Sequence, residues 1–553
     1  MLTCKIVSSM EKCFLDGDIV ALHALSRVSI LKNERLSIQL AYTETEKTAA
    51  SLRLLTLRTS GLPEGALRVR RVESVPVAMP VYQGVHDDNY LRTTPGLYPD
   101  LLMPLPYQES VMVSGGQLHA LWLDIDPRGM LTAGDHTLTL SLVEGEQVLC
   151  ERSLRIHIVD AELPENEMYV TQWFHCDSLA HYYRVETFSE QHWAIVEQFA
   201  RTAAENGINT LLTPILTPPL DTRIGGERLT TQLIGVTRNG DDYAFDFSLL
   251  DRWVDMCDRV GIRYLEISHL FTQWGAAYAP KVMATVDGQY RRIFGWDTPA
   301  TGEAYATFLR ALISAMLAHL RARGDDRRCV FHISDEPTGA EHLAQYKAVK
   351  AIVSDLLEGY LTVDALSNFD FYEQGIVEHP VAANDHIAPF LKAGVKGLWT
   401  YYCCGQGSGN VSNRFIAMPG ARTRSIGMPM FKYDIAGFLQ WGYNFYSNRL
   451  TTDLVDPYHD TCGDYGFPGG DSFSVYPAPD GTAYESMRLL QFRDALTDRR
   501  AMTLAAALCG KETVIAEMER VVGEIHFDTS LRAAEDVHAV REAVNALIER
   551  HLG

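Results

Sequence analysis

Several common signals are missing from this sequence. Its first twenty residues hold no apolar core of the length that a signal peptide needs, and no apolar run elsewhere is long enough to cross a bilayer. The ten cysteines are scattered without the paired spacing of a metal site. These absences predict a cytoplasmic protein with reduced thiols, no membrane association, no bound metal and no cofactor.

Positive charge is also scarce. The 553 residues include 49 Lys and Arg against 70 Asp and Glu, a formal net charge of -21, without a long basic cluster. Such a chain is a poor partner for nucleic acid, although the charge does not restrict a neutral ligand such as a sugar. The length predicts two or three domains and allows a homo-oligomer.

Residues 1–163 alternate short apolar segments with turn signals. The period is close to two, which is typical of an antiparallel β-sandwich. Within this region, residues 92–106 contain four prolines. Because proline cannot join a central ladder, we expect an ordered but irregular loop there. The predicted strands include 35–42, 51–57, 118–125 and 136–143.

Strands and helices alternate across residues 164–505. This alternation of strands and helices predicts a (β/α)8 barrel with long loops after several strands. A doubly wound open sheet is the alternative, but no Gly-rich nucleotide-binding loop follows the first predicted strand. Residues 506–553 are helical in pattern and form a predicted C-terminal segment. The barrel strands are predicted at 169–174, 208–213, 263–268, the apolar part of 328–337, 360–364, 397–402 and 437–441, and long helices at 191–206, 247–260 and 303–323.

Residues 328–337, with the sequence RCVFHISDEP, lead from a buried strand into two adjacent acids. Pro337 disfavours the helical conformation for the residue before it, so we expect an extended Glu336 on a rim. Two neighbouring carboxylates cannot both ionise cheaply, so one pKa should rise while the other group stays charged. That pairing suits glycosidic cleavage, which needs a proton donor and a fixed anion. The alternative is that Asp335 and Glu336 cap the next helix.

Aromatic and polar side chains collect near the ends of the predicted strands, where a barrel places its pocket. This mixture suits a carbohydrate, because aromatic faces pack on sugar C–H surfaces while carboxylates bind hydroxyls. A phosphate site would need a Gly-rich loop or a basic clamp, and neither is evident. The candidate substrate-binding residues are His269, Trp274, His332, Asp364, Trp399, Tyr401, Tyr402 and Trp441.

Two histidines and two cysteines could suggest a metal site or a nucleophile, but each pair is better explained by a structural role. His269 and His332 could bind a metal, but no third His or Cys lies at ligand spacing, so pocket or core histidines are expected. Cys403 and Cys404 have no recognisable base partner, which favours two buried structural cysteines over a nucleophile.

The chain resembles the catalytic domain of family 123 glycoside hydrolases. The resemblance covers about residues 165–505 and, less specifically, the N-terminal β-domain. Many uncharacterised proteins share this catalytic domain, so the order and spacing of the motifs identify the domain more firmly than the substrate. The segments that carry the resemblance are 268–275 (SHLFTQWG), 294–297 (FGWD), 331–337 (FHISDEP), 364–367 (DALS), 399–404 (WTYYCC), 437–441 (GFLQW) and 486–494 (SMRLLQFRD).

The resemblance implies a β-sandwich followed by a barrel and a retaining, substrate-assisted β-N-acetylgalactosaminidase, an exception to the usual two-carboxylate scheme. Asp335 would hold the N–H of the substrate's 2-acetamido group, and Glu336 would protonate the leaving oxygen and then activate water. Tyr401 or Tyr402 would bind the acetamido oxygen, and Trp399 and Trp441 would line the pocket around the sugar.

Two alternatives stay open from the sequence. One is a glycosidase that does not need the acetamido group, with Glu336 as acid/base and another acid such as Asp364 as nucleophile. The other is a non-catalytic glycan-binding protein, since fold alone does not determine activity.

Overall fold

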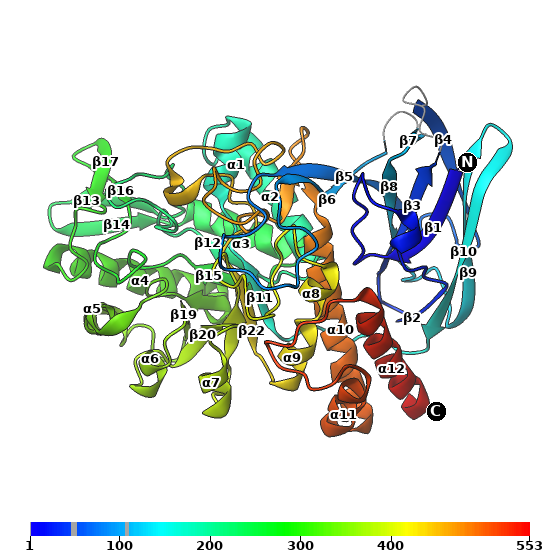
Figure 1. Cartoon of the computed structure of the whole chain (residues 1–553). Coiled ribbons are helices and arrows are strands. Elements are labelled where there is room, and N and C mark those ends of the chain that lie inside the picture. The colour runs from blue at the N-terminus through cyan, green and yellow to red at the C-terminus, as the bar shows by residue number, and fades with distance from the viewer. Residues whose placement is uncertain (1, 46–51, 106–109, 553) are drawn as a thin grey trace.

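The computed structural model describes residues 2–45, 52–105 and 110–552. A β-sandwich, a closed eight-stranded parallel barrel and a C-terminal group of helices follow one another along the chain. Figure 1 shows the sandwich in blue and cyan on one side, the barrel beside it, and the red C-terminal helices next to both. The predicted fold class is confirmed. No helix among the described residues combines the length and apolarity needed to span a bilayer.

The sandwich consists of two five-stranded sheets that enclose an aliphatic core between them. Neighbouring strands are antiparallel except for β2 and β10, which run parallel. One sheet has the order β1 (Leu2–Ser8), β3 (Leu36–Glu44), β8 (Leu118–Ile125), β5 (Leu67–Val77) and β6 (Gly96–Met103). The other has the order β2 (Arg27–Leu31), β10 (Gln147–Val159), β9 (Gly134–Glu144), β4 (Leu52–Ser60) and β7 (Ser110–Ser114).

The proline-rich segment differs from its prediction. Within 92–106, where an irregular loop was expected, Gly96–Met103 forms strand β6. It lies at the end of the strand order and pairs with β5, with a register shift beside Pro99, and Leu101 forms an isolated bridge with Ser486. An edge strand needs ladder bonds on one side only, so the missing N–H of a proline is tolerated there. Pro106 lies outside the described residues.

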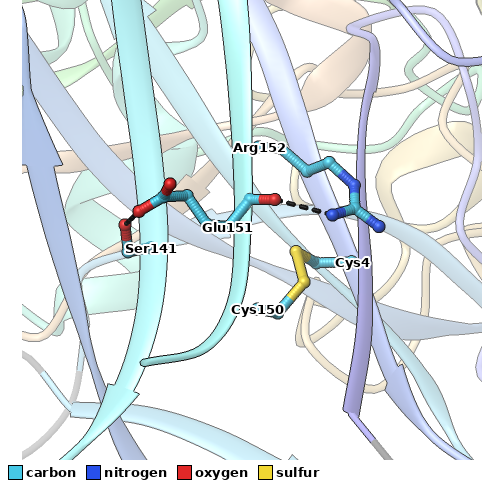
Figure 2. Close-up of a disulfide and its surroundings, with 5 residues drawn as sticks. All are labelled: Cys4, Ser141, Cys150, Glu151 and Arg152. Atoms are coloured by element: carbon cyan, nitrogen blue, oxygen red, sulfur yellow. Dashed lines mark hydrogen bonds between the residues drawn. A yellow bond between two sulfur atoms is a disulfide. The ribbon is translucent and has the colours of Figure 1, made fainter. Parts of the chain in front are cut away.

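The two sheets are joined by a disulfide between Cys4 on β1 and Cys150 on β10 (Figure 2). The prediction that all cysteines are reduced is therefore wrong for this pair. The spacing of 146 residues gave no signal in the sequence, because the two cysteines meet only when the sheets pack. Disulfides form and persist mainly in oxidising compartments, which weighs against the predicted cytoplasmic location.

Reduction of this disulfide should destabilise the sandwich. Its long loop restricts the unfolded chain, so we expect a loss of about 2–4 kcal/mol. The measurement is the melting temperature with and without dithiothreitol, for the wild type and for a Cys4→Ser, Cys150→Ser variant. Cys509→Ser, at a free and half-buried cysteine, is the matched control and should still respond to reductant. Equal melting of the wild type in both conditions would contradict the prediction.

The barrel closes between its first and last strands, since β22 pairs in parallel with β11. Seven of its strands were predicted, whereas β20 was not, because its sequence begins His379-Pro380 and contains only a short apolar run. The strands, in barrel order, are β11 (Tyr169–Gln172), β12 (Thr210–Thr213), β15 (Tyr264–Ile267), β18 (Cys329–Phe331), β19 (Leu361–Leu366), β20 (His379–Ala383), β21 (Trp399–Tyr401) and β22 (Gly437–Gln440).

Helices and small sheets complete the barrel. The α4 helix has the predicted bounds, Glu303–Arg323, and ends at Gly324 in the left-handed conformation that glycine adopts at low cost. The other helices are α1 (Cys176–Tyr183), α2 (Glu190–Glu205), α3 (Ser248–Val260), α5 (Gly339–Val353), α6 (Asp370–Glu373), α7 (Ala388–Lys392), α8 (Gly420–Arg424) and α9 (Gly427–Lys432), with 3-10 turns at Ile19–Ala21, Asp326–Arg328 and Arg449–Thr451. A four-stranded sheet of β14 (Asp242–Asp246), β13 (Gly235–Asn239), β16 (Val282–Val286) and β17 (Gln289–Phe294) and a two-stranded sheet of β23 (Val475–Pro477) and β24 (Ala483–Glu485) are additions to the barrel.

Three C-terminal helices follow, α10 (Met487–Cys509), α11 (Lys511–Val522) and α12 (Ala534–Leu552). The first of them links the barrel to the sandwich. Arg488 on α10 donates two hydrogen bonds to Asp100 on β6, at 2.8 and 2.9 Å, and both side chains are fully buried. A buried charge needs such a partner, so this pair holds the sandwich in one position against the barrel.

Candidate active site

A cavity of about 240 Å³ opens at the carboxyl end of the barrel, where the loops after the strands meet. Its wall combines carboxylates, aromatic rings and two thiols. One of its side chains, Tyr82, comes from the loop between β5 and β6 of the sandwich, so the site is shared by both domains. The cavity is lined by Tyr82, Trp173, Leu220, Asp221, Gln273, Trp274, Asp335, Glu336, Ala365, Tyr401, Cys403, Cys404, Leu439, Trp441, Arg449 and Phe467.

The two adjacent acids stand just past the end of β18, and both face this cavity. Glu336 has φ 43°, in the left-handed region, so the predicted extended conformation is wrong. Trp274 also has a positive φ, of 57°, and its backbone N–H donates to the carbonyl of Asp335 at 3.0 Å. Strained residues of this kind persist only where the surroundings hold them, and they concentrate at functional sites.

The two carboxylates have different surroundings. Glu336 Oε1 accepts a hydrogen bond from the Tyr401 hydroxyl at 2.8 Å. The Asp335 carboxylate has no hydrogen-bond donor among the described residues, which leaves it open to a ligand. Burial raises the pKa of Asp335 well above its usual value, and the neighbouring Glu336 raises it further. Burial also raises the pKa of Glu336, while the bond from Tyr401 lowers it. The pair therefore retains a proton at higher pH than ordinary carboxyls.

Beneath the acids lies His332, held between two buried carboxylates. Its Nε2 is 2.7 Å from Glu266 Oε1, and its Nδ1 is 3.5 Å from Asp364 Oδ1. Burial alone would lower the pKa of His332, but Asp364 and Glu266 outweigh that effect and raise the pKa to about 9. His332 is thus an imidazolium at neutral pH, and its charge opposes the rise in the pKa of Asp335.

Glu266 and Asp364 are each fixed by further donors. Glu266 accepts hydrogen bonds from the Thr171 hydroxyl and, at 2.9 Å, from the Trp173 indole, whose ring also lines the cavity. Asp364 accepts from the backbone N–H of Ile333 at 3.0 Å and from the Tyr346 hydroxyl. These bonds satisfy carboxylates that would otherwise be costly to bury.

His269 stacks on His332, with ring centroids 4.4 Å apart and planes at 25°. Burial lowers the pKa of His269 well below its usual value, and the charge of His332 adds to this effect, so His269 is neutral. His269, His332 and Asp364 place possible metal ligands within 4.8 Å of one another. However, His332 is already bonded to Glu266, and Asp364 is already bonded to Ile333 and Tyr346. The group suits a buried ion pair better than a metal.

The opposite wall of the cavity is built from loops. The Trp441 indole donates to Asp471 Oδ2 at 2.9 Å, which fixes the ring against Phe467. Asp221 contributes a third carboxylate, and burial raises its pKa to about 6. Cys403 and Cys404 both line the cavity and are only half buried, in contrast to the buried cysteines expected there.

The predicted site residues fall into three groups. Asp335, Glu336, Trp274, Tyr401 and Trp441 line the cavity. His269, His332 and Asp364 are fully buried beneath it. Trp399 and Tyr402 lie elsewhere in the barrel.

The positions of Trp399 and Tyr402 follow from strand geometry. Trp399 is the first residue of β21 and stacks on Tyr169, the first residue of β11, so it lies at the amino end of the barrel. Tyr402 follows Tyr401 directly and points to the other side, where it packs on Phe438 at 5.0 Å. Neither residue can reach a sugar in the cavity.

Other site residues were not predicted. Glu266 had a signal in the sequence, because it is the one acid in the predicted strand 263–268 and lies between Leu265 and Ile267. Tyr82, Asp221 and Arg449 had none, since they lie on long loops of ordinary composition that the fold brings to one place.

The comparisons with known proteins agree with this geometry. Residues 173–505 match the family model described as glycoside hydrolase 123, catalytic domain. A family 123 glycoside hydrolase from Clostridium perfringens, described in terms of glycolipid glycan hydrolysis, superposes with a TM-score of 0.74 at 14% identity. The superposition covers 100% of this chain and 98% of that one. The family 123 fold therefore extends over both the sandwich and the barrel.

Other matches are weaker. A family 39 glycoside hydrolase from Bacteroides cellulosilyticus has a TM-score of 0.31 at 11% identity, covering 80% of this chain and 83% of that one. A family 2 member from the same organism has a TM-score of 0.28 at 11% identity, covering 82% and 47%. Similarity at this level supports no structural argument. No curated protein matches the chain.

Proposed function

Because the chain belongs to glycoside hydrolase family 123, we propose that it is a retaining, exo-acting β-N-acetylgalactosaminidase that uses substrate-assisted catalysis. Its substrate is an oligosaccharide or glycoconjugate, such as a glycolipid glycan, that ends in an amino sugar. The observation that carries the proposal is the Asp335 carboxylate, which has no hydrogen-bond donor among the described residues and stands beside Glu336 in a small cavity. At about 240 Å³ the cavity is smaller than the roughly 300–1,000 Å³ of sites for drug-sized ligands, which suits a single sugar.

In this mechanism Asp335 accepts a hydrogen bond from the N–H of the 2-acetamido group. That bond orients the acetamido carbonyl oxygen toward C1, and the oxygen attacks C1 as the glycosidic bond breaks. Glu336 donates its proton to the leaving oxygen and then takes a proton from the water that opens the oxazolinium intermediate. The first step therefore requires a proton on Glu336 and a negative charge on Asp335, and the second step starts with Glu336 deprotonated.

The substrate itself supports this distribution of the proton. Burial raises the pKa of both acids in the free protein, and the neighbouring Glu336 raises the pKa of Asp335 further, so the pair retains a proton more readily than ordinary carboxyls do. An N–H donor that binds Asp335 stabilises its ionised form, as does the His332 imidazolium, which lowers the pKa of Asp335. The proton then resides on Glu336, where the leaving group needs it.

The two-carboxylate alternative has less support. Asp364, its suggested nucleophile, is fully buried beneath the cavity and bonded to Ile333 and Tyr346. The other carboxylate that faces the cavity is Asp221, on the opposite loop. A covalent mechanism would need its nucleophile among the remaining carboxylates that face the cavity, Asp221 or Asp335.

The acetamido requirement distinguishes the two mechanisms directly. We expect the wild type to hydrolyse an aryl β-N-acetylgalactosaminide at least about 100-fold faster, in kcat/KM, than the matching aryl β-galactoside, because only the former carries the internal nucleophile. A thiazoline that mimics the oxazolinium ion should inhibit competitively. Both are measured by release of the aryl group. Comparable rates on the two glycosides, without thiazoline inhibition, would refute the substrate-assisted mechanism.

A further inference from the structure

Two adjacent thiols, Cys403 and Cys404, face the catalytic cavity and take no part in the proposed mechanism. Both are free and only half buried. Of the other free cysteines in the described chain, five are buried, and the sixth, Cys509 on α10, does not line this cavity. Cys403 and Cys404 are therefore the free thiols that a solute meets when it enters the cavity.

A turn brings these two side chains to the same side of the chain. Neighbouring residues of a strand point to opposite faces, as Tyr401 and Tyr402 do, but β21 ends at Tyr401 and a turn begins at Cys404. The side chains of Cys403 and Cys404 consequently lie in hydrogen-bond contact with each other. The two sulfur atoms are close enough to bind one atom between them.

Hydrogen bonds hold the backbone of this segment in place. The N–H of Cys403 donates to Gln406 Oε1 at 2.9 Å, and the carbonyl of Cys403 accepts from Asn413 Nδ2 at 2.8 Å. The N–H of Cys404 donates to the carboxylate of Asp471. A ligand that binds both thiols thus finds them already ordered, which lowers the entropic cost of binding.

The charges around the pair decide which reagents it suits. The hydrogen bond with Cys404 and burial raise the pKa of Cys403 well above its usual value, and the charge of Glu336 raises it further. The cavity wall also holds more carboxylates than cations. Reactions that need a thiolate are therefore slow at Cys403, and anionic reagents are repelled. An uncharged reagent that condenses with neutral thiols suits the site.

A direct bond between the two sulfur atoms would be strained. Adjacent Cα atoms are about 3.8 Å apart, whereas the Cα atoms of ordinary disulfides are roughly 4.4–6.8 Å apart. One larger atom bonded to both sulfurs avoids this strain, because the sulfurs then stay separate. Thiol sulfur is a soft ligand and prefers a soft acceptor.

We propose that Cys403 and Cys404 form a binding site for one thiol-seeking atom, the trivalent arsenic of an uncharged arsenical, and that its occupation closes the catalytic cavity. An arsenoxide, R–As=O, exchanges its oxygen for two arsenic–sulfur bonds, and the oxygen leaves as water with both thiol protons. No electrons are transferred, because the arsenic stays trivalent. The group R then occupies the cavity beside Glu336. Only this blocking of catalysis rests on the proposed function.

The probe is phenylarsine oxide, and its binding is measured by native mass spectrometry and calorimetry without reductant, so that the Cys4–Cys150 disulfide stays closed. We expect one phenylarsenic group per chain. Cys403→Ser or Cys404→Ser leaves a single thiol, and loss of the second attachment should weaken binding about 10²–10⁴-fold. Cys509→Ser removes a half-buried thiol outside the cavity and is the matched control, which should bind the probe as the wild type does.

Reversal distinguishes a two-thiol site from a single modified cysteine. The dithiol 2,3-dimercaptopropanol should release the phenylarsenic group, whereas 2-mercaptoethanol at the same thiol concentration should release little of it. Equal binding by the wild type and either single variant, or no binding by the wild type, would overturn the inference. If a serine variant fails to fold, Cys403→Ala and Cys404→Ala provide the same comparison.

Activity tests the blocking of the cavity separately. One equivalent of phenylarsine oxide should abolish wild-type turnover of the aryl β-N-acetylgalactosaminide, and 2,3-dimercaptopropanol should restore it. Full turnover by protein that carries the phenylarsenic group would overturn the claim that the bound group closes the cavity. If the untreated wild type shows no glycosidase activity, the proposed function fails, while the binding comparison still tests the dithiol site.

Discussion

Replacing Glu336 with Gln is expected to lower kcat by about 10²–10⁴-fold on a glycan with an alkoxide leaving group. The amide fills the same space and can still accept the hydrogen bond from Tyr401, but it has no proton to give to the leaving oxygen. An aryl glycoside with an acidic phenol leaving group needs less protonation and should lose less in its first step. Steady-state kinetics on the two substrates, with KM and kcat separated, measure this difference.

The same variant has a second readout in its stability. Because burial raises the pKa of Glu336, the wild-type fold holds a proton at pH values where the unfolded chain has released it. The stability of the wild type should therefore fall as pH rises through the folded pKa, and Glu336→Gln should weaken that dependence. Glu378→Gln, at an exposed acid far from the cavity, is the matched control. A Glu336→Gln variant with wild-type kcat on the unactivated glycan would exclude the acid/base role.

Replacing His332 with Gln should destabilise the protein by about 3–5 kcal/mol, because it leaves Glu266 and Asp364 as buried carboxylates without a cation. The folded pKa of His332 is about 9, above the usual value for histidine. Its contribution is thus complete below the unfolded pKa and is lost as pH rises through about 9. Melting temperatures from pH 6 to 10 for wild type and variant measure both effects.

Activity supplies a readout that a purely structural role would not affect. The His332 imidazolium holds down the pKa of Asp335, so its loss should move the limb of the pH–rate profile that depends on Asp335 toward higher pH. The Glu266→Gln, His332→Gln double variant removes one carboxylate with the cation and should recover part of the stability. A His332→Gln variant with the same melting temperature and pH slope as the wild type would show that His332 is not charged.

Local patterns in the chain were good predictors of local structure. The α4 helix has its predicted bounds because both of its signals, the apolar spacing and the closing Gly324, are contained in the segment itself. The apolar run before Asp335 became β18 for the same reason. Predictions failed where a residue's surroundings came from distant parts of the chain. Pro99 is in a strand because that strand is at an edge, and the edge depends on the whole sheet.

The site shows the same division. The sequence placed Asp335, Glu336 and Tyr401 together, because each follows or ends a predicted barrel strand, and barrel strands end at one rim. It did not distinguish the two ends of β21, so Trp399 was assigned to the pocket although it lies at the amino end. It also placed His332 in contact with substrate, whereas the side chain is fully buried beneath the acids.

By itself, then, the sequence determined the sandwich, the barrel, the terminal helices and the pair of acids at the end of the fourth barrel strand, all from short-range periodicity and one motif. Only the tertiary structure decided the charge state and environment of those acids. His332 becomes a cation because Glu266 and Asp364, from two other strands, close around it. The Cys4–Cys150 disulfide and the contribution of Tyr82 likewise depend on the packing of segments far apart in the chain. Periodicity shows which residues are buried, but the pKa of a buried group depends on its neighbours in space.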